Sequence, residues 1–266
     1  MKNKTILITG STDGIGLETA RMLVSQGHNV LLHGRNSIKL TRIAEELNIR
    51  EQYRADLSIM NEVRKLGEEI RLKHDHVDVL INNAGVFTTG GMTPDGLDLR
   101  FAVNTVAPFF LTSLLLPIMD RDSRVVNLSS AAQSTVNLEA MMGNVANISA
   151  NSAYSMSKLA ITMWSRYLGN ELRENGPVVI AVNPASLLGS KMVKEAYGVK
   201  GGDLRIGADI LCRASLSDDF AQASGKYFDN DRGIFAMPHP DALDDELVIE
   251  VVRLIERILV RTGVKK

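Results

Sequence analysis

The sequence predicts one doubly wound α/β domain over residues 1–266, with a mostly parallel seven-stranded sheet and helices on both of its faces. Short runs rich in Val and Ile alternate with longer amphipathic segments, which is the pattern of β-α-β units. No repeat, low-complexity stretch or linker rich in Pro, Gly and Ser divides the chain. With 45% hydrophobic residues, the 266 residues are enough to bury the core of one such domain.

The apolar runs, each bounded by turn-forming residues, are the predicted strands. Between them, apolar residues recur at helical spacing. A stripe from Leu247 to Leu259 predicts a further surface helix at the C-terminal end. The predicted strands are 5–9, 29–33, 49–55, 77–81, 124–129, 178–183 and a short seventh at 227–228, and the predicted helices are 15–26, 38–47, 59–73, 97–119 and 151–174.

The composition narrows the class of partner. Thirty Lys and Arg residues balance 31 Asp and Glu residues without any block of like charge, so we expect no nucleic-acid partner and no anionic-membrane surface. The most apolar stretch, 106–119, is shorter than the roughly 20 residues that span a bilayer, which predicts a buried helix and no membrane span. No metal site is predicted. The polar N-terminus and the single cysteine, Cys212, predict a cytoplasmic protein.

Three glycines, Gly10, Gly14 and Gly16, lie where the first predicted strand passes into the first helix. Glycine lets the backbone approach a pyrophosphate closely, and a helix N-terminus offers unpaired N–H groups to an anion. A tight turn alone would also explain the glycines, and the Gly-Lys-Ser/Thr of an ATPase loop is missing. The strand before and the helix after favour the dinucleotide-binding turn of a Rossmann domain, with Ser11, Thr12 and Ile15 also at the cofactor.

The end of the second predicted strand indicates which dinucleotide is bound. It carries Arg35 and Asn36, and it has no acid where an NAD enzyme holds the ribose 2′-hydroxyl. A guanidinium pairs well with a 2′-phosphate, often through two hydrogen bonds. The sequence therefore predicts NADP(H) in preference to NAD(H). Arg35 as a solvated loop residue, or Arg42 as the relevant cation, are the alternatives.

Tyr154 and Lys158 carry side chains suited to proton transfer. Their spacing at the start of a predicted helix places the phenol and the ammonium on one face. A neighbouring cation lowers the pKa of a tyrosine from about 10 toward the working pH. A solvated surface pair would have the same spacing, so this pair alone leaves both interpretations open.

Two further polar residues stand at informative places. Ser130 follows the fifth predicted strand, where its hydroxyl can hydrogen-bond a substrate carbonyl or simply form a turn. Asn104 lies inside an apolar helical segment, although asparagine is a poor helix former. A buried amide needs hydrogen-bond partners, so Asn104 indicates a polar network.

With these segments in this order, the sequence resembles the short-chain dehydrogenase/reductase (SDR) family over essentially its whole length, and in pattern it is most similar to the retinol-dehydrogenase-like branch. The resemblance implies an oxidoreductase that transfers a hydride between NADP(H) and a carbonyl or alcohol substrate. The motifs that carry it are T-G-x-x-x-G-x-G at 9–16, Asp56-Leu57, N-N-A-G at 82–85, Asn104, N-x-S-S at 127–130 and Y-x-x-x-K at 154–158.

The resemblance implies a catalytic tetrad of Asn104, Ser130, Tyr154 and Lys158. Tyr154 would exchange a proton with the substrate oxygen, and Ser130, chosen over Ser129 from the motif, would polarise the carbonyl. Lys158 would hold the nicotinamide ribose and lower the pKa of Tyr154, and Asn104 would keep a proton-relay water in place.

The same resemblance implies the remaining cofactor contacts. Asp56 would bind the adenine side through its carboxylate and Leu57 through its backbone. Two departures from the family pattern follow the sixth strand: Asn183-Pro-Ala185 stands where Pro-Gly is usual, and Ser190 stands where a threonine is usual. The other implied contacts are Asn83, Ala84, Gly85, Pro184 and Ser190, together with Tyr154 and Lys158.

Two segments are the predicted substrate region. The glycine-rich segment 187–204 is expected to be a mobile substrate loop at the carboxyl edge of the sheet. The interval 131–153 is longer than in compact members of the family. Its apolar residues could close a pocket for an apolar substrate, or they could simply pack the loops onto the sheet. These residues are Leu138, Met141, Met142, Val145 and Ile148, with Met192, Val193 and Tyr197 from the later loop.

The resemblance also implies a quaternary state, and one alternative function stays open. The expected assembly is a homodimer or homotetramer formed through the helices 97–119 and 151–174. The alternative is a non-catalytic, NADP(H)-sensing binding protein on the same fold, because a fold does not dictate a function.

Overall fold

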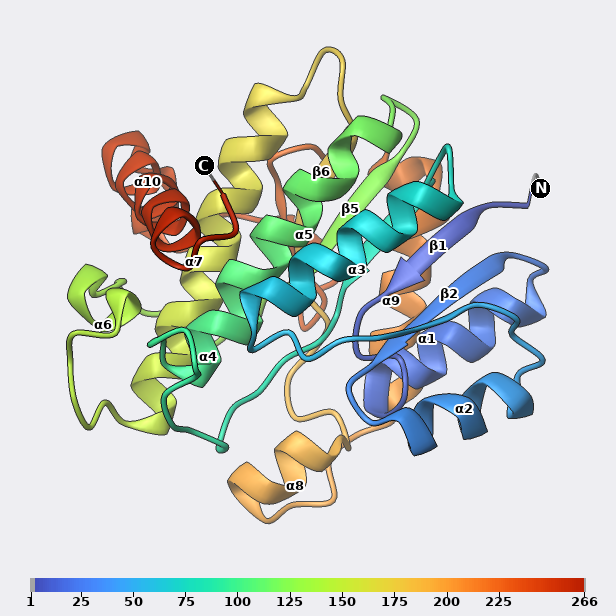
Figure 1. Ribbon diagram of the computed structural model, residues 1–266, viewed down its shortest axis with the longest axis horizontal. Helices are drawn as coiled ribbons and strands as arrows, with labels where there is room; N and C mark the ends of the chain where they lie inside the picture. Colours follow the sequence, from blue (N-terminus) through green and yellow to red (C-terminus); the bar gives the residue numbers. More distant parts are fainter. Residues whose placement is uncertain (1–2, 266) are drawn as a thin grey trace.

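The computed structural model describes residues 3–265, which form one continuous sheet with helices on both faces (Figure 1). The seven predicted strands are all present. The strands are β1 (Thr5–Ile8), β2 (Asn29–Gly34), β3 (Gln52–Arg54), β4 (Val79–Asn82), β5 (Arg124–Leu128), β6 (Val178–Asn183), β7 (Tyr227–Asp229) and β8 (Ile234–Ala236). Their spatial order is β3-β2-β1-β4-β5-β6-β7-β8, and every pair is parallel except β7 with β8.

The number of strands corrects the sequence prediction, because β8 adds an eighth, antiparallel strand at one edge. It spans three residues and returns from β7 through a turn that includes Gly233, whose φ of +66° suits glycine. Three residues are too few to give a strand its alternating pattern, so the sequence carries little signal for this strand.

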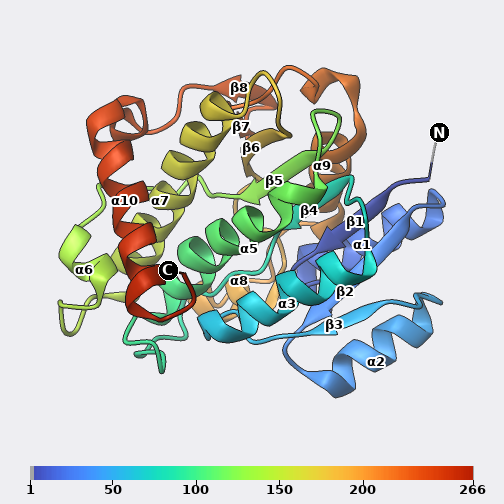
Figure 2. The same ribbon diagram turned by 45° about the horizontal axis from the view of Figure 1, so that its top comes forward.

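The helices divide between the two faces of the sheet. The first face holds α3 (Met60–Lys73), α5 (Ala107–Leu115), α7 (Ala150–Glu171) and α10 (Asp245–Arg261), and the second holds α1 (Gly14–Ser25), α2 (Ser37–Glu46) and α9 (Leu204–Leu216). Figure 2 shows α3, α5 and α7 in front of the sheet. Successive residues of β1 point to opposite faces, with Leu7 in the first core and Ile6 and Ile8 in the second. The short helices are α4 (Leu99–Phe101), α6 (Leu138–Met142) and α8 (Lys191–Tyr197).

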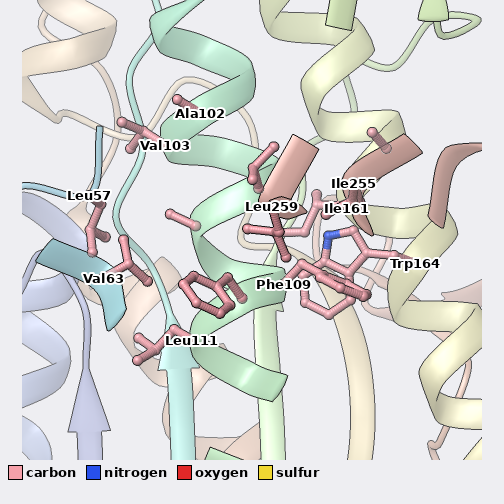
Figure 3. Packing of buried hydrophobic residues seen from close by; sticks show 14 of the residues in the cluster. Leu57, Val63, Ala102, Val103, Phe109, Leu111, Ile161, Trp164, Ile255 and Leu259 are labelled. Atoms are coloured by element: carbon pink, nitrogen blue, oxygen red, sulfur yellow. The ribbon is translucent and has the colours of Figure 1, made fainter. Parts of the chain in front are cut away.

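One of the long helices was not predicted. The sequence pattern indicates no helix over α9, although α9 packs on α1 and contributes Ile210 and Leu211 to the second core. The C-terminal stripe is confirmed in α10, where Ile255 and Leu259 pack near Trp164 of α7 and Phe109 of α5 (Figure 3). Phe109 and Trp164 meet edge to face, with ring centroids 5.6 Å apart.

The predicted helix 97–119 is a series of helical pieces. After α4 comes a π-helical turn over Ala102–Val106, then α5, and then a short 3₁₀ turn over Leu116–Ile118. Together Leu99–Ile118 are 20 residues with a mean hydropathy of 1.7, which by length and composition alone is enough to cross a membrane. Here 72% of that window is buried, and the segment packs between α3 and α7 as a core helix, as expected for 106–119.

Candidate active site

The glycine turn between β1 and α1 is fixed by the segment that follows β4. The Asn83 Nδ2 donates to Thr9 O at 2.9 Å and to Gly10 O at 3.1 Å, while the backbone N–H groups of Asn83 and Ala84 donate to Thr9 Oγ1. Gly10 has a φ of +66°, and a Cβ on Gly16 would lie 2.3 Å from Asn83 Nδ2. The turn therefore needs glycine at both positions, and it presents the N-terminus of α1 toward the sheet edge.

Three residues predicted to contact the cofactor from this turn have different surroundings. Ser11 is fully buried, its Oγ accepts from His33 N–H at 2.9 Å, and its own N–H donates to His33 O at 3.0 Å. The hydroxyl and the N–H of Ser11 therefore hold β2, and its predicted cofactor contact stays a prediction. Thr12 is half-buried over Gly34, and Ile15 is half-buried beside Gly207 of α9.

His33 is a functional residue that the sequence analysis missed. Its Nδ1 accepts a hydrogen bond from Gly10 N–H at 3.1 Å, and its side chain is buried at the end of β2. Burial lowers the pKa of His33 to about 4, against smaller opposing effects of Ala55 and Asp56. The neutral imidazole therefore helps to shape the glycine turn.

We expect His33 to make the protein less stable in acid. Its pKa is about 4 in the folded state and about 6.5 in the unfolded state, so the unfolded state binds the extra proton first as the pH falls. Between pH 6.5 and pH 4 this difference should remove about 3 kcal/mol from the free energy of unfolding. Chemical denaturation across this range should show a shallower pH dependence for His33→Asn, whose Oδ1 can still accept from Gly10. Parallel curves for the two proteins would contradict the assignment.

The predicted 2′-phosphate site lies at the ends of β2 and β3. Arg35 is exposed after β2, and its carbonyl oxygen accepts from Arg54 Nε at 3.4 Å. Asn36 is the N-cap of α2, where its Oδ1 accepts from Lys39 N–H at 2.9 Å, so this oxygen is already used within the fold. Lys39 forms an ion pair with Asp13 at 2.9 Å. Arg35 and Arg54 therefore lie together at the ends of these strands, and the pairing of Arg35 with a 2′-phosphate stays a prediction.

The predicted adenine contacts lie after β3. The Asp56 Oδ1 accepts from both the N–H and the Oγ of Ser58, at 2.9 and 2.7 Å, and the Asp56 N–H donates to Glu62. These bonds hold the carboxylate of Asp56 in one orientation. Leu57 is buried against the first core.

Asn104 lies in the π-helical turn and is fully buried. Its Oδ1 accepts from Val86 N–H at 2.9 Å, while its Nδ2 donates to Val86 O at 2.9 Å and to Ser157 Oγ at 3.0 Å. The predicted polar network is therefore present. Through it Asn104 ties the segment after β4 to α7, and π-helical turns often occur at functional sites.

Tyr154 and Lys158 lie on α7, one turn apart, with Lys158 Nζ 5.7 Å from the centroid of the Tyr154 ring. Lys158 is buried, its Nζ donates to Leu128 O at 2.7 Å, and burial lowers its pKa to about 8. Burial raises the pKa of Tyr154, and a hydrogen bond with Ser130 acts in the opposite direction. Burial thus gives Tyr154 a net upward pKa shift, opposite to the lowering expected from Lys158, and it also disfavours the charge on Lys158.

The structure separates the two neighbouring serines after β5. Ser129 is buried, and its Oγ donates to Lys158 O at 3.0 Å and bonds Thr162 Oγ1 at 2.6 Å, so its hydroxyl is used within the fold. Ser130 is half-buried beside Tyr154, and its carbonyl oxygen accepts from Tyr227 OH at 3.1 Å. This arrangement favours Ser130 as the serine that faces a substrate.

The predicted residues from the segment after β4, the π-helical turn and α7 meet at Gly85. A Cβ on Gly85 would lie 3.4 Å from Asn104 Oδ1 and 3.7 Å from both Lys158 Nζ and Met192 Cε. Glycine at this position therefore leaves room beside the amide and the ammonium.

The residues after β6 border the same region. Ser190 is the N-cap of α8, with its Oγ accepting from Val193 N–H at 3.2 Å, and its Cβ would be 3.8 Å from a Cβ on Gly14. The Pro184 carbonyl accepts from Asn230 Nδ2 at 3.0 Å. The Ser190 hydroxyl predicted for the nicotinamide is thus already used as a helix cap.

Phe87 is a second residue that the sequence analysis missed. Its ring lies 4.4 Å from the Tyr154 ring and 5.8 Å from the Tyr197 ring of α8, so it links the 187–204 segment with the predicted proton donor. Most of the predicted pocket residues of 131–153 have another role. Met141 belongs to the first core, and Leu138, Met142 and Ile148 pack against it. Their packing onto the sheet was the alternative that the sequence left open.

Among residues 3–265, no group of three or more His, Cys, Asp and Glu side chains is arranged to hold a metal ion.

Comparison with known proteins identifies the family. The model of the short chain dehydrogenase family matches residues 4–198, so the chain belongs to this family of oxidoreductases. Within it, the retinol-dehydrogenase-like branch predicted from the sequence is confirmed. The chain is 31% identical to human retinol dehydrogenase 13 over 271 residues, covering 92% of this chain and 81% of that protein. It is 32% identical to the chloroplastic short-chain dehydrogenase TIC 32 A of Brassica napus, covering 85% and 80%.

Solved structures agree with the fold. An uncharacterised protein from Mycobacterium paratuberculosis superposes with a TM-score of 0.81 at 27% identity, covering 98% of this chain and 94% of that one. A short-chain dehydrogenase from Shigella flexneri, solved in complex with NADP, superposes with a TM-score of 0.68 at 25% identity, covering 87% and 98%.

Proposed function

We propose that this protein is an NADP(H)-dependent oxidoreductase that interconverts a carbonyl and an alcohol, with Tyr154 as general acid and base. The observation that carries the proposal is the gathering of Asn104 and Lys158 at Gly85, with Ser130 beside Tyr154 on the same edge of the sheet. Structural packing alone does not require a phenol, a hydroxyl and a buried ammonium to share one sheet edge.

The chain has the groups that a dinucleotide needs. The glycine turn with Thr12 and Ile15 at the start of α1 would hold the pyrophosphate, and Asp56 and Leu57 the adenine. The segment Asn83, Ala84, Gly85, together with Lys158 and Pro184, would border the nicotinamide ribose. When bound, the cofactor supplies or accepts the hydride. Arg35, without an acid at the end of β2, supports a preference for NADP(H), and the Shigella relative solved with NADP is consistent with it.

In the direction of reduction, the substrate carbonyl carbon receives a hydride and its oxygen receives the Tyr154 phenol proton. The raised pKa of Tyr154 keeps the phenol protonated near neutral pH, which suits a proton donor. Ser130 Oγ would hydrogen-bond the same oxygen and polarise the carbonyl. The pKa of Lys158, about 8, leaves this ammonium able to exchange protons near the working pH. Asn104 would order the backbone along which a relay water could bind.

We propose a cytoplasmic location, consistent with a single cysteine, Cys212, that is buried in α9 and needs no oxidising compartment. We also propose a homodimer or homotetramer through the helices 97–119 and 151–174, as the family resemblance implies. In α5 only Ser113 is exposed and α10 packs on α7, so such an interface would use the half-buried and exposed residues that remain on these helices.

The function can be tested with the purified protein. It should be titrated separately with NADPH and NADH while nicotinamide fluorescence is followed, and then mixed with a broad panel of aldehydes and ketones while the absorbance of the reduced cofactor is recorded. Tight NADPH binding with oxidation by some carbonyls is the expected result. Tight binding without turnover across the panel would favour the non-catalytic sensor instead, and a preference for small charged substrates would contradict an apolar substrate.

Arg35→Asp should reverse the cofactor preference. The change removes the guanidinium and places a carboxylate beside the 2′-phosphate, so we expect NADPH affinity to fall by roughly 10- to 100-fold while NADH affinity stays equal or improves. Fluorescence titration measures both constants. Arg42→Asp in the exposed part of α2 is the matched control, and a larger effect there would move the phosphate site from Arg35 to Arg42.

A further inference from the structure

The chain leaves β6 through a turn that most side chains avoid. Ala185 has a φ of +112° and Leu187 a φ of +52°, and neither residue is glycine. Residues with a Cβ rarely adopt positive φ, and they do so only where the surrounding structure holds them. The departure from Pro-Gly that the sequence shows at Ala185 therefore stores strain at the entrance of the 187–204 loop.

One carboxylate holds this turn. Asp231, in the turn between β7 and β8, accepts from Ser186 N–H at 2.7 Å through Oδ1 and from Ser186 Oγ at 2.6 Å through Oδ2. The same Oδ2 accepts from Asn183 Nδ2 at 2.9 Å. Asp231 therefore accepts hydrogen bonds from residues on both sides of Ala185. Partial burial tends to raise the pKa of Asp231, but the bonds from Ser186 and Asn183 outweigh it and lower the pKa.

The turn leads directly into the loop that faces the site. Leu187 O accepts from Gly202 N–H at 2.8 Å, and Gly202 O accepts from Gly189 N–H at 2.8 Å, which closes the base of the loop. The enclosed α8 brings Met192 Cε next to Gly85 and the Tyr197 ring next to Phe87. In Figure 1, α8 projects beyond the body of the sheet. The position of α8 therefore depends on the backbone hydrogen bonds that close the base of the loop.

We propose that Asp231 is a positioning residue that holds the strained Ala185–Leu187 turn and, through it, keeps the 187–204 loop over the nicotinamide side of the site. The inference deepens the proposed function and rests on it for the identity of that site. The alternative is that Asp231 only joins the β7–β8 turn to β6, with no influence on the loop.

Limited trypsin digestion of the native protein tests this directly, because Lys191, Lys194 and Lys200 all lie within the loop. Asp231 and Ser186 are exposed, so water competes with their hydrogen bonds and a moderate effect is expected. We expect Asp231→Ala to speed cleavage in the loop by about fivefold to tenfold and to weaken NADPH binding by a similar factor. Asp231→Asn, which keeps one accepting oxygen, should have a smaller effect. Asp75→Ala, an exposed acid remote from the loop, is the control.

A double variant separates positioning from simple loss of structure. Ala185→Gly removes the Cβ that makes the positive φ costly, so the turn needs less restraint. Adding Ala185→Gly to Asp231→Ala should therefore slow loop cleavage and raise NADPH affinity, each by at least about threefold relative to Asp231→Ala alone. Such a departure from additivity is expected of two coupled residues. Three results would each overturn the proposal. Loop cleavage could be unchanged in Asp231→Ala, cleavage could accelerate equally at all lysines of the protein with a lower Tm, or the double variant could behave like Asp231→Ala. Digestion needs no nucleotide, so a wild-type protein that failed to bind NADPH would refute the function while leaving the loop result intact.

Discussion

Tyr154→Phe should reduce turnover by roughly 10²- to 10⁴-fold, the range that a positioned general acid usually contributes. The change removes one oxygen and leaves the ring, whose centroid lies 4.4 Å from that of Phe87, so the packing of the site is preserved. Because the phenol is not assigned to the dinucleotide phosphates, NADPH affinity should change by less than about threefold. Steady-state rates with the best carbonyl substrate, together with fluorescence titration, separate these two effects.

The matched control for Tyr154→Phe is Tyr197→Phe on α8. Tyr197 faces the same Phe87 ring but is half exposed, and it is not in the predicted tetrad. Its loss of a hydroxyl should alter KM for the substrate more than kcat. If both variants kept full turnover, the proton would come from another group, and the assignment of Tyr154 would be wrong.

The positions of the strands along the chain and the segments that carry the motifs could be predicted because each depends on local sequence. The glycine turn follows the apolar run Ile6–Ile8 and precedes an amphipathic helix, and both segments form as predicted in β1 and α1. The helix α9 was missed although it packs on α1, because small residues such as Gly207, Ala208 and Cys212 make up most of its buried face beside Ile210 and Leu211. Small residues give close helix packing but only a weak hydrophobic signal.

Residues that act through tertiary contacts could not be predicted from the sequence. His33 looks like an ordinary strand residue until the fold brings its Nδ1 to Gly10 N–H. Phe87 lies far from Tyr197 in sequence, and no pattern links them. Conversely, Ser11 and Asn36 are in the expected segments, yet backbone N–H groups already bond their side chains. The Ser11 partner is His33 on β2, and the Asn36 partner is Lys39 in the first turn of α2. The motif gives the segment, whereas the hydrogen bonds decide which side chains remain available.

The sign of the pKa shift at Tyr154 illustrates the same limit. The spacing of Tyr154 and Lys158 suggested an ammonium that lowers the pKa of the phenol. In the fold Lys158 is buried and Tyr154 is half-buried, and burial disfavours the phenolate and the ammonium alike. Sequence spacing reports which groups are close, but it does not report how much water they retain.

Gly16→Ala should abolish tight cofactor binding, because the close approach of α1 to the segment after β4 leaves no room for a methyl group. A Cβ on Gly16 would lie 2.3 Å from Asn83 Nδ2 and 2.5 Å from Gly10 O, well inside van der Waals contact. Relief requires α1 to move away from β4, and that movement breaks the hydrogen bonds from Asn83 to Thr9 and Gly10. We expect NADPH affinity to fall by at least about 100-fold and the free energy of unfolding by about 1–3 kcal/mol, as in other overpacked sites.

Gly27→Ala provides the control for Gly16→Ala, because Gly27 follows the other end of α1 and has open space around it. Its φ of +83° makes alanine unfavourable there, yet a Cβ would meet no atom within 4 Å. This variant should lose about 1 kcal/mol of stability through the backbone and bind NADPH normally. Fluorescence titration and chemical denaturation of both variants distinguish a displaced phosphate turn from a general weakening of α1. If Gly16→Ala bound NADPH as tightly as the wild type, the N-terminus of α1 would not be where the pyrophosphate lies.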